Sequence, residues 1–244
     1  MSPQSIYVTR HGTRQDFVSS EPFVSLTGSD VDPPLADTIG EKQAQALSRY
    51  LSGLTESSKI KHIFCSPFTR CLQTVRPFAE SQGLPIKIDY GLGEWFKTDE
   101  PVDEDPATAP SLDELAALDL FNIDPSYRSP LQYNDTCWES KEGLHDRLRE
   151  TVLRIAREYE DQGDILIVTH AAPMICVGRA LCSDRQLIVK CGVASLFKVS
   201  KDDPSAPGPW RLDLNGETSY LEGGLEYDWL FHDERTPEWI AAHK

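Results

Sequence analysis

Short apolar runs recur along the chain and predict β-strands at residues 5–9, 60–65, 84–89, 164–170 and 194–199. The run DILIVTH at 164–170 is uninterrupted, which is typical of a strand buried on both faces of a parallel sheet. Side chains capable of chemistry stand at, or just past, the carboxyl ends of three of these runs. These positions are therefore the first place to look for a functional site.

Amphipathic stretches separate the runs and predict helices at about residues 38–54, from 67 onward, at 140–161 and at 171–182. Thr38 and Glu41 match a capping box at the start of the first helix. Ser66 and Pro67 suit the N-cap and the first position of the second. Strands and helices thus alternate along most of the chain.

Two stretches interrupt this alternation. Residues 14–37 are loop-like, with DVDPPL as the strongest breaker. Residues 97–140 are rich in Pro, Asp and Glu, and they predict one short helix near 112–118, where Ser111 and Glu114 form another capping box. We interpret 97–140 as an insertion between core elements.

The alternation predicts an α/β fold with three layers, α/β/α, in which a mostly parallel central sheet carries helices on both faces. We expect residues 1–244 to form a single domain, with the insertion at about 97–140 and a C-terminal hairpin extension at about 201–244. Asn215-Gly216 predicts a two-residue hairpin turn in that extension. Ligands bind such sheets outside the carboxyl ends of the strands.

Composition narrows the function classes. The 244 residues carry a formal net charge of −15 and no Lys/Arg cluster, so we expect neither direct nucleic-acid binding nor membrane binding. The sequence shows no signal peptide and no apolar window of roughly 18 residues. Six cysteines without CxxC spacing favour reduced thiols in an intracellular protein, cytoplasmic or nuclear. We expect no metal and no cofactor.

The candidate residues each have a structural alternative when taken singly. Arg10 and His11 directly follow the first predicted strand, but a histidine at a strand end is more often structural. His170 could cap the next helix, and Arg70 could be a surface arginine of the second helix. Glu94, in GLGEW, could be an ordinary loop acid. Their common placement is what indicates a site.

Together these residues indicate an anion site. Two histidines and two or three arginines around one point suit a phosphoryl group. Neighbouring positive charge disfavours the protonated form of His11, which leaves its imidazole able to attack phosphorus. Gly12 permits close approach of the backbone to a ligand. Glu94 could protonate the leaving oxygen and later activate water.

Four motifs resemble, in order, the histidine phosphatase (phosphoglycerate mutase-like) superfamily: RHG at 10–12, SPFTRCLQT at 66–74, GLGEW at 91–95 and VTHAAP at 168–173. With DPPLADTIGEKQAQAL, the resemblance spans roughly residues 5–200. RHGTR, GLGEWFK and DPSYRSP are similar to the branch containing phosphotyrosine phosphatases of the UBASH3/TULA type. The tail WRLDLNGETSYLEGGLEYDW extends the likeness to the histidine-phosphatase domain of a tau subunit of fungal transcription factor IIIC.

The resemblance implies a phosphoglycerate mutase-like fold and a cofactor-independent phosphomonoesterase that forms a phosphohistidine. It makes His11 the nucleophile and Glu94 the acid/base, with His170 as the third catalytic residue. The phosphate oxygens would be held by Arg10, Arg14, Arg70 and His170. The substrate it implies is a phosphopeptide or a small phosphate ester.

Three functions remain open at this point. Trp95 and Phe96, beside the acid, could hold an aromatic substrate such as phosphotyrosine, or could belong to the core. Mutase activity is disfavoured because the segment after Glu94, KTDEPVDEDPATAP, is acidic and offers no cationic grip for phosphoglycerate. The transcription-factor resemblance and the aromatic tail suit an assembly module with protein partners in a transcription complex and weak phosphatase activity.

Overall fold

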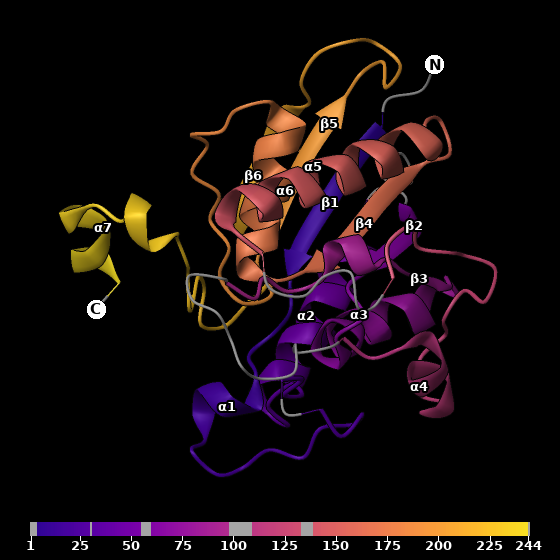
Figure 1. Ribbon diagram of the computed structural model, residues 1–244, viewed down its shortest axis with the longest axis vertical. Coiled ribbons are helices and arrows are strands. Elements are labelled where there is room, and N and C mark those ends of the chain that lie inside the picture. Colours follow the sequence, from indigo (N-terminus) through magenta and orange to yellow (C-terminus); the bar gives the residue numbers. More distant parts are fainter. Residues whose placement is uncertain (1–3, 30, 55–59, 98–108, 133–138, 244) are drawn as a thin grey trace.

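A single sheet orders the described strands as β3-β2-β4-β1-β5-β6 (Figure 1). The computed structural model describes residues 4–29, 31–54, 60–97, 109–132 and 139–243. The strands are β1 Gln4–Arg10, β2 Ile60–Cys65, β3 Ile86–Ile88, β4 Asp164–Thr169, β5 Leu196–Lys201 and β6 Arg211–Glu217. The first four in chain order pair in parallel, β5 is antiparallel to β1, and β6 is antiparallel to β5. The predicted mostly parallel α/β sheet is confirmed.

Helices cover both faces of the sheet (Figure 1). They are α1 Gln15–Val18, α2 Ile39–Ser52, α3 Thr69–Gln82, α4 Leu112–Ala117, α5 Lys141–Glu158, α6 Ala171–Cys182 and α7 Pro237–Ala242. Short 3₁₀ turns occupy Tyr90–Leu92 and His232–Glu234. α2 and α3 pack on one face, α5 and α6 on the other, and α7 lies at one end of the molecule, where its Trp239 packs against the core beneath α5 and α6. The three-layer prediction is therefore correct.

The residues of β4 show why the sheet is buried on both sides. Ile165 and Ile167 belong to the core beneath α5 and α6, whereas Leu166 and Val168 belong to the core beneath α2 and α3. Successive side chains of a strand point to opposite faces, so an unbroken apolar run fills both cores at once. Burying each such side chain stabilises the fold by about 1.5–3 kcal/mol.

The strand ends meet at one edge of the sheet. Arg10 is in register with Thr169, and the backbone N–H of His11 donates to the Thr169 carbonyl at 3.0 Å. The N–H of Ser66 donates to the Val168 carbonyl at 2.9 Å. These ladder bonds fix the ends of β1, β2 and β4 against one another, so the residues that follow them converge.

The capping box predicted at the start of α2 is wrong. Thr38 does occupy the N-cap, but its backbone is in the right-handed helical region and its side chain makes no capping hydrogen bond. The chain enters α2 from a preceding turn, in which the N–H of Gly40 donates to the Ala36 carbonyl at 2.9 Å. The backbone thus satisfies the N–H of Gly40, whereas the predicted capping box would have satisfied the N–H of Glu41.

The predicted start of α3 is also wrong. The helix begins at Thr69, with Phe68 as N-cap, two residues later than Ser66 and Pro67 suggest. The buried carboxylate of Asp32 accepts from the N–H of Thr69 at 3.1 Å to each oxygen. A side chain distant in sequence therefore caps α3.

The predicted hairpin turn at Asn215-Gly216 is wrong as well. Both residues lie within β6, and residues 202–210 make the connection from β5. Gly216 has φ +77, and the pairing register between β5 and β6 shifts at this point. The dipeptide does supply the left-handed conformation that a tight turn needs, but the chain uses it for a bulge.

The predicted insertion is described only in part, because residues 98–108 and 133–138 lie outside the described residues. The helix inside it is confirmed, since Ser111 and Glu114 form the predicted capping box of α4. The five cysteines of the described chain are free thiols. Among the described residues, no helix is both long and apolar enough to cross a membrane.

Candidate active site

Two adjacent strand ends bring the two candidate histidines together. His11 follows β1 and His170 follows β4, and their rings lie edge to face with centroids 5.3 Å apart. Both side chains are buried, as are the side chains of Arg10 and Arg70. The structure thus assembles the histidines and two of the arginines that the sequence singles out.

His11 is held as a neutral imidazole. Its Nδ1 lies 2.7 Å from the Gly12 carbonyl, which can only accept, so the proton sits on Nδ1 and Nε2 carries the free lone pair. Burial lowers the pKa of His11 well below its usual value, and the charges of Arg70 and Arg10 lower it further. The arrangement suits a nucleophile rather than a cation.

The expectation that Gly12 makes room for a ligand needs correction. A Cβ at this position would lie 3.2 Å from both the Gly40 carbonyl and the side-chain oxygen of Gln43. The missing side chain therefore leaves space for α2. The Gly12 N–H also donates to the Thr74 hydroxyl at 2.9 Å, which ties the residue after His11 to α3.

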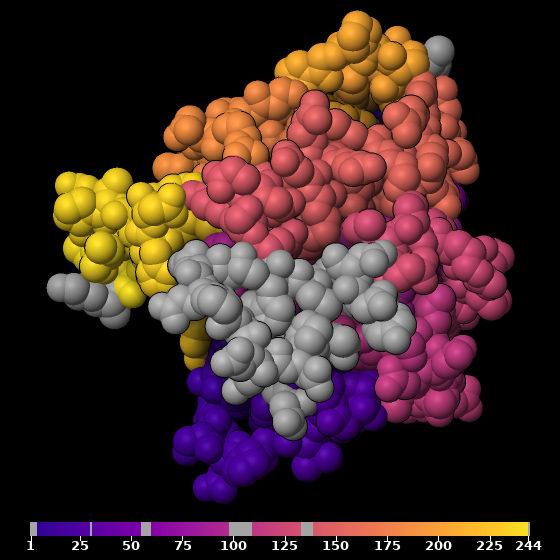
Figure 2. All heavy atoms as spheres, viewed as in Figure 1, coloured from indigo at the N-terminus to yellow at the C-terminus, as the bar shows by residue number. Residues whose placement is uncertain are grey.

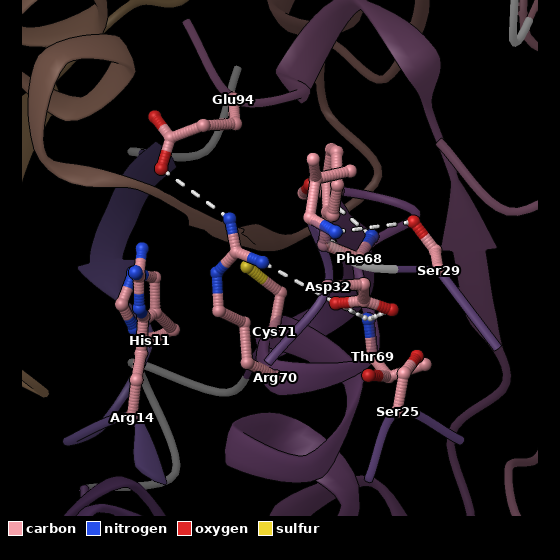
Figure 3. Close-up of polar contacts among 12 residues, drawn as sticks. His11, Arg14, Ser25, Ser29, Asp32, Phe68, Thr69, Arg70, Cys71 and Glu94 are labelled. Carbon is pink, nitrogen blue, oxygen red and sulfur yellow. Dashed lines mark hydrogen bonds and ion pairs between the residues drawn. The ribbon is translucent and has the colours of Figure 1, made fainter. Parts of the chain in front are cut away.

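Arg70 is the central cation of the site (Figure 3). Its guanidinium donates to Asp32 at 3.3 Å, to Glu94 at 3.3 Å and to Nδ1 of His170 at 3.1 Å. Its side chain is only 1% exposed. Its Nε has no partner among the described residues, so a buried donor is available to an incoming anion.

His170 is oriented by three neighbours. Its Nδ1 lies 3.1 Å from the Arg70 guanidinium, a donor, and 3.2 Å from the Glu94 carboxylate, an acceptor, while its Nε2 lies 2.7 Å from the Ser66 hydroxyl, which can donate or accept. Burial lowers the pKa of His170 to about 4 and Arg70 adds to the effect, while Glu94 partly opposes it. His170 is therefore neutral near pH 7.

Glu94 is ionised in the ligand-free site. Burial raises the pKa of its carboxyl, but adjacent His170 and Arg70 outweigh that effect and hold the pKa well below its usual range. Its Oε2 lies 3.3 Å from Arg70 and 3.2 Å from His170. To act as an acid, this carboxylate must first gain a proton, which a bound phosphate dianion would promote by repelling its charge.

The two N-terminal arginines are held by partners of their own, Arg10 in the buried site and Arg14 at a partly exposed position. Arg10 donates to the carbonyls of Cys191 and Tyr227 at 3.0 and 2.7 Å, and its Nε is buried without a partner among the described residues. Arg14 pairs with Asp16 and lies 4.7 Å above the centre of the Phe17 ring. Asp16 thus holds Arg14 in the ligand-free protein, and a phosphate would have to compete with it.

Sequence reasoning missed Asp32 and the bond between Ser66 and His170. DVDPPL drew attention only as a chain breaker, although its second aspartate is fully buried between Thr69 and Arg70. Burial raises the pKa of Asp32, and Arg70 opposes that rise. An acid next to an apolar PPL segment was the available signal.

A divalent cation is a poor match for this cluster. The ligating atoms of His11, Glu94 and His170 all lie within 4.8 Å of one another, a spacing that could hold a metal ion. The guanidinium groups of Arg70 and Arg10 lower the pKa of His11, so their positive charge reaches the same point. Their repulsion of a cation and attraction of an anion favour a phosphoryl group.

Replacing Asp32 by alanine is expected to lower the free energy of unfolding by about 3 kcal/mol. The change removes a buried counter-charge from Arg70 and the cap from α3. Urea denaturation measures the effect. Asp37→Ala, an exposed carboxylate nearby, is the matched control, and equal losses in both variants would contradict the assignment.

Acid is expected to destabilise the ligand-free protein between about pH 6.5 and pH 4. The pKa values of His170 and of buried His145 are lowered to about 4, in each case chiefly by burial. A histidine of the unfolded chain has a pKa of about 6.5, so in this window the unfolded chain binds more protons than the folded protein. The free energy of unfolding therefore decreases as the pH is lowered. Each histidine contributes about 1.4 kcal/mol per pH unit.

Urea denaturation at several pH values across that window measures the slope. The variant His145→Gln removes one of three buried histidines with a strongly lowered pKa, the others being His11 and His170, and should flatten the slope by about a third. Free energies of unfolding that do not change between pH 6.5 and pH 5 would show that these histidines titrate as freely in the folded protein as in the unfolded chain.

Residues 6–187 match the histidine phosphatase superfamily (branch 1). The chain is 31% identical to the transcription factor tau 55 kDa subunit of Saccharomyces cerevisiae, over 95% of this chain and 59% of that protein. It is 27% identical to the ecdysteroid-phosphate phosphatase of Drosophila melanogaster, over 86% of this chain and 31% of that protein. The chain thus spans between a third and three-fifths of these relatives.

Solved structures share the fold. The ecdysone phosphate phosphatase of Bombix mori, in complex with tungstate, superposes with a TM-score of 0.66 at 20% identity, covering 87% of this chain and 93% of that one. A mycobacterial glucosyl-3-phosphoglycerate phosphatase does so with a TM-score of 0.57 at 18% identity, covering 88% and 100%. The protein belongs to the histidine phosphatase superfamily, and that membership implies phosphomonoesterase chemistry.

Proposed function

We propose that the protein hydrolyses phosphate monoesters, of the aryl type, through a phosphohistidine formed on His11. The observation that carries the proposal is the neutral His11, with Nε2 free, enclosed with the cationic groups of Arg10 and Arg70. A neutral nucleophile beside fixed positive charge suits attack on a phosphoryl group and stabilises its equatorial oxygens.

The reaction proceeds in two steps. Nε2 of His11 forms a bond to phosphorus while the ester oxygen leaves and takes a proton from Glu94. A water then gives a proton to the Glu94 carboxylate and attacks phosphorus, releasing inorganic phosphate and free His11. Arg10, Arg70 and His170 hold the oxygens in both steps, with Arg14 joining them when it leaves Asp16.

Aromatic rings near the arginines support an aryl leaving group. Phe17 packs against Tyr227, with the rings tilted by 32° and their centroids 5.0 Å apart, and lies beneath Arg14, so an aromatic surface borders the cations. Trp95 suits the role less well, because its indole N–H donates to Glu139 and its ring packs on Phe231. We therefore assign the aromatic contact to Phe17 and Tyr227.

Trapping the intermediate tests the proposal. The enzyme is mixed with p-nitrophenyl phosphate, quenched at alkaline pH to preserve phosphohistidine, digested and analysed by mass spectrometry. We expect a phosphate on His11 and faster turnover of aryl than of alkyl phosphates. Turnover without a phosphate on His11 would overturn the mechanism.

A second candidate function is an assembly module with weak or secondary phosphatase activity, acting with protein partners in a transcription complex. It is favoured by the similarity to the tau 55 kDa subunit along 95% of this chain and by α7, which lies at one end of the molecule with Ile240 exposed (Figures 1 and 2). A stable complex captured equally by wild type and His11→Ala, from a protein without turnover, would support it.

Interconversion of 2- and 3-phosphoglycerate tests the mutase alternative.

A further inference from the structure

A second cationic cavity lies between α5 and α6, which pack side by side on one face of the sheet (Figure 1). Its volume is about 220 Å³. Its lining residues are His145, Arg149, Cys176, Arg179, Ala180, Ser183 and Arg185. In a chain of net charge −15, three arginines border this one cavity and no carboxylate appears among its described lining residues.

The buried histidine of this cavity has no hydrogen-bond partner within the described chain. His145 is only 3% exposed, yet its ring contacts an aromatic neighbour, Phe231, at 5.8 Å between centroids rather than a polar group. Buried polar side chains are nearly always hydrogen-bonded. The ring nitrogens of His145 are not among the fully enclosed side-chain atoms that lack a partner, so they open onto the cavity, where a ligand can pair with them.

Two of the three arginines are also uncommitted. Arg149 and Arg185 are exposed, and neither forms an ion pair or side-chain hydrogen bond with the described residues. Arg179, in contrast, is paired with Glu234 at 3.1 Å and donates to the Leu187 carbonyl at 3.0 Å. The free positive charge at this cavity thus belongs to Arg149 and Arg185.

The end of α6 does not oppose an anion as strongly as a helix C-terminus usually would. The carbonyls of Arg179, Ala180 and Leu181 accept from the N–H groups of Asp184, Ser183 and Trp210. With these acceptors engaged, the groups that face the cavity are mainly donors and cations. The charges of Arg185 and Arg179 act on His145 strongly enough to reinforce the lowering of its pKa.

We propose that this cavity binds a small doubly charged oxyanion, either inorganic phosphate or the phosphate group of a small ester. Arg149 and Arg185 would donate charge-assisted hydrogen bonds, His145 would donate a ring N–H, and the Ser183 hydroxyl would complete the contacts. The site is separate from the active site, because Arg179 lies nine residues beyond His170 along α6, roughly 14 Å by helical rise.

Histidine NMR tests the proposal without any dependence on turnover. The Cε1–H signal of His145, assigned by its loss in His145→Gln, is followed while orthophosphate replaces chloride at constant ionic strength. We expect a saturating shift of that signal in the wild-type protein. Arg149→Gln and Arg185→Gln should each weaken the apparent affinity roughly tenfold, the loss expected for one charge-assisted hydrogen bond.

Arg157→Gln is the matched control, since Arg157 is an exposed arginine of the same helix outside the cavity, and its titration should match that of the wild type. Phosphoserine in place of orthophosphate tells the two ligand sources apart: a response to both assigns a phosphate-group site, and a response to orthophosphate alone assigns a free-phosphate site. A His145 signal that ignores phosphate, or that responds equally in all three arginine variants, would overturn the proposal.

Discussion

Replacing His11 by alanine is expected to reduce turnover of p-nitrophenyl phosphate by more than about 10⁴-fold. The nucleophile cannot be substituted from nearby. The other buried histidine of the site, His170, has Nδ1 bonded to Arg70 and Nε2 bonded to Ser66. Cys71 is also adjacent, but burial raises the pKa of its thiol far above the usual value, so it carries no thiolate.

The control for this variant is His62→Ala, which removes a histidine near the start of β2, at the other end of the strand from Ser66. Among the described residues, its Nε2 bonds only to the Gln162 carbonyl. Steady-state assays of both variants, with circular dichroism to verify folding, give the comparison. A folded His11→Ala protein that retains more than about a tenth of wild-type turnover would disprove the phosphohistidine route.

The core of the fold follows directly from local patterns. The run DILIVT could be predicted as a doubly buried strand because its alternate side chains fill two separate cores. α6 begins and ends where Ala171 and Cys182 predict. Helix starts were less predictable because their donors were satisfied from elsewhere: Asp32 caps α3 from a loop, and a backbone turn precedes α2. The residues at these two helix starts do not themselves indicate such partners.

The composition of the site was predictable, but its electrostatics were not. Strand-end placement correctly brought His11, His170 and Arg70 together. It did not predict that Asp16 holds Arg14 or that Glu94 is already paired with Arg70. These ion pairs depend on side-chain rotamers and on the paths of loops. The spacing of residues along the sequence does not reveal either. A phosphate substrate must displace these ion pairs when it binds to the ligand-free protein.

Replacing Glu94 by glutamine is expected to slow turnover of an alkyl phosphate by roughly 10²–10⁴-fold, the usual contribution of a general acid. The side-chain oxygen that accepts from Arg70 is retained, but the exchangeable proton is lost. Removing a negative charge from the neighbourhood of Arg70 and His170 also removes a competitor for phosphate, so KM should not rise. Glu142→Gln, an exposed acid in the first turn of α5, is the matched control.

The two steps assigned to Glu94 can be separated with p-nitrophenyl phosphate. p-Nitrophenolate leaves without needing a proton, so formation of phosphohistidine should remain fast in Glu94→Gln, whereas its hydrolysis, which needs Glu94 as base, should be slow. Stopped-flow absorbance should then show a burst of about one p-nitrophenolate per enzyme, followed by a slow phase, with phosphate accumulating on His11. Equal slowing on aryl and alkyl substrates without a burst would assign Glu94 to positioning Arg70 instead of to proton transfer, since Glu94 Oε2 and the guanidinium are only 3.3 Å apart.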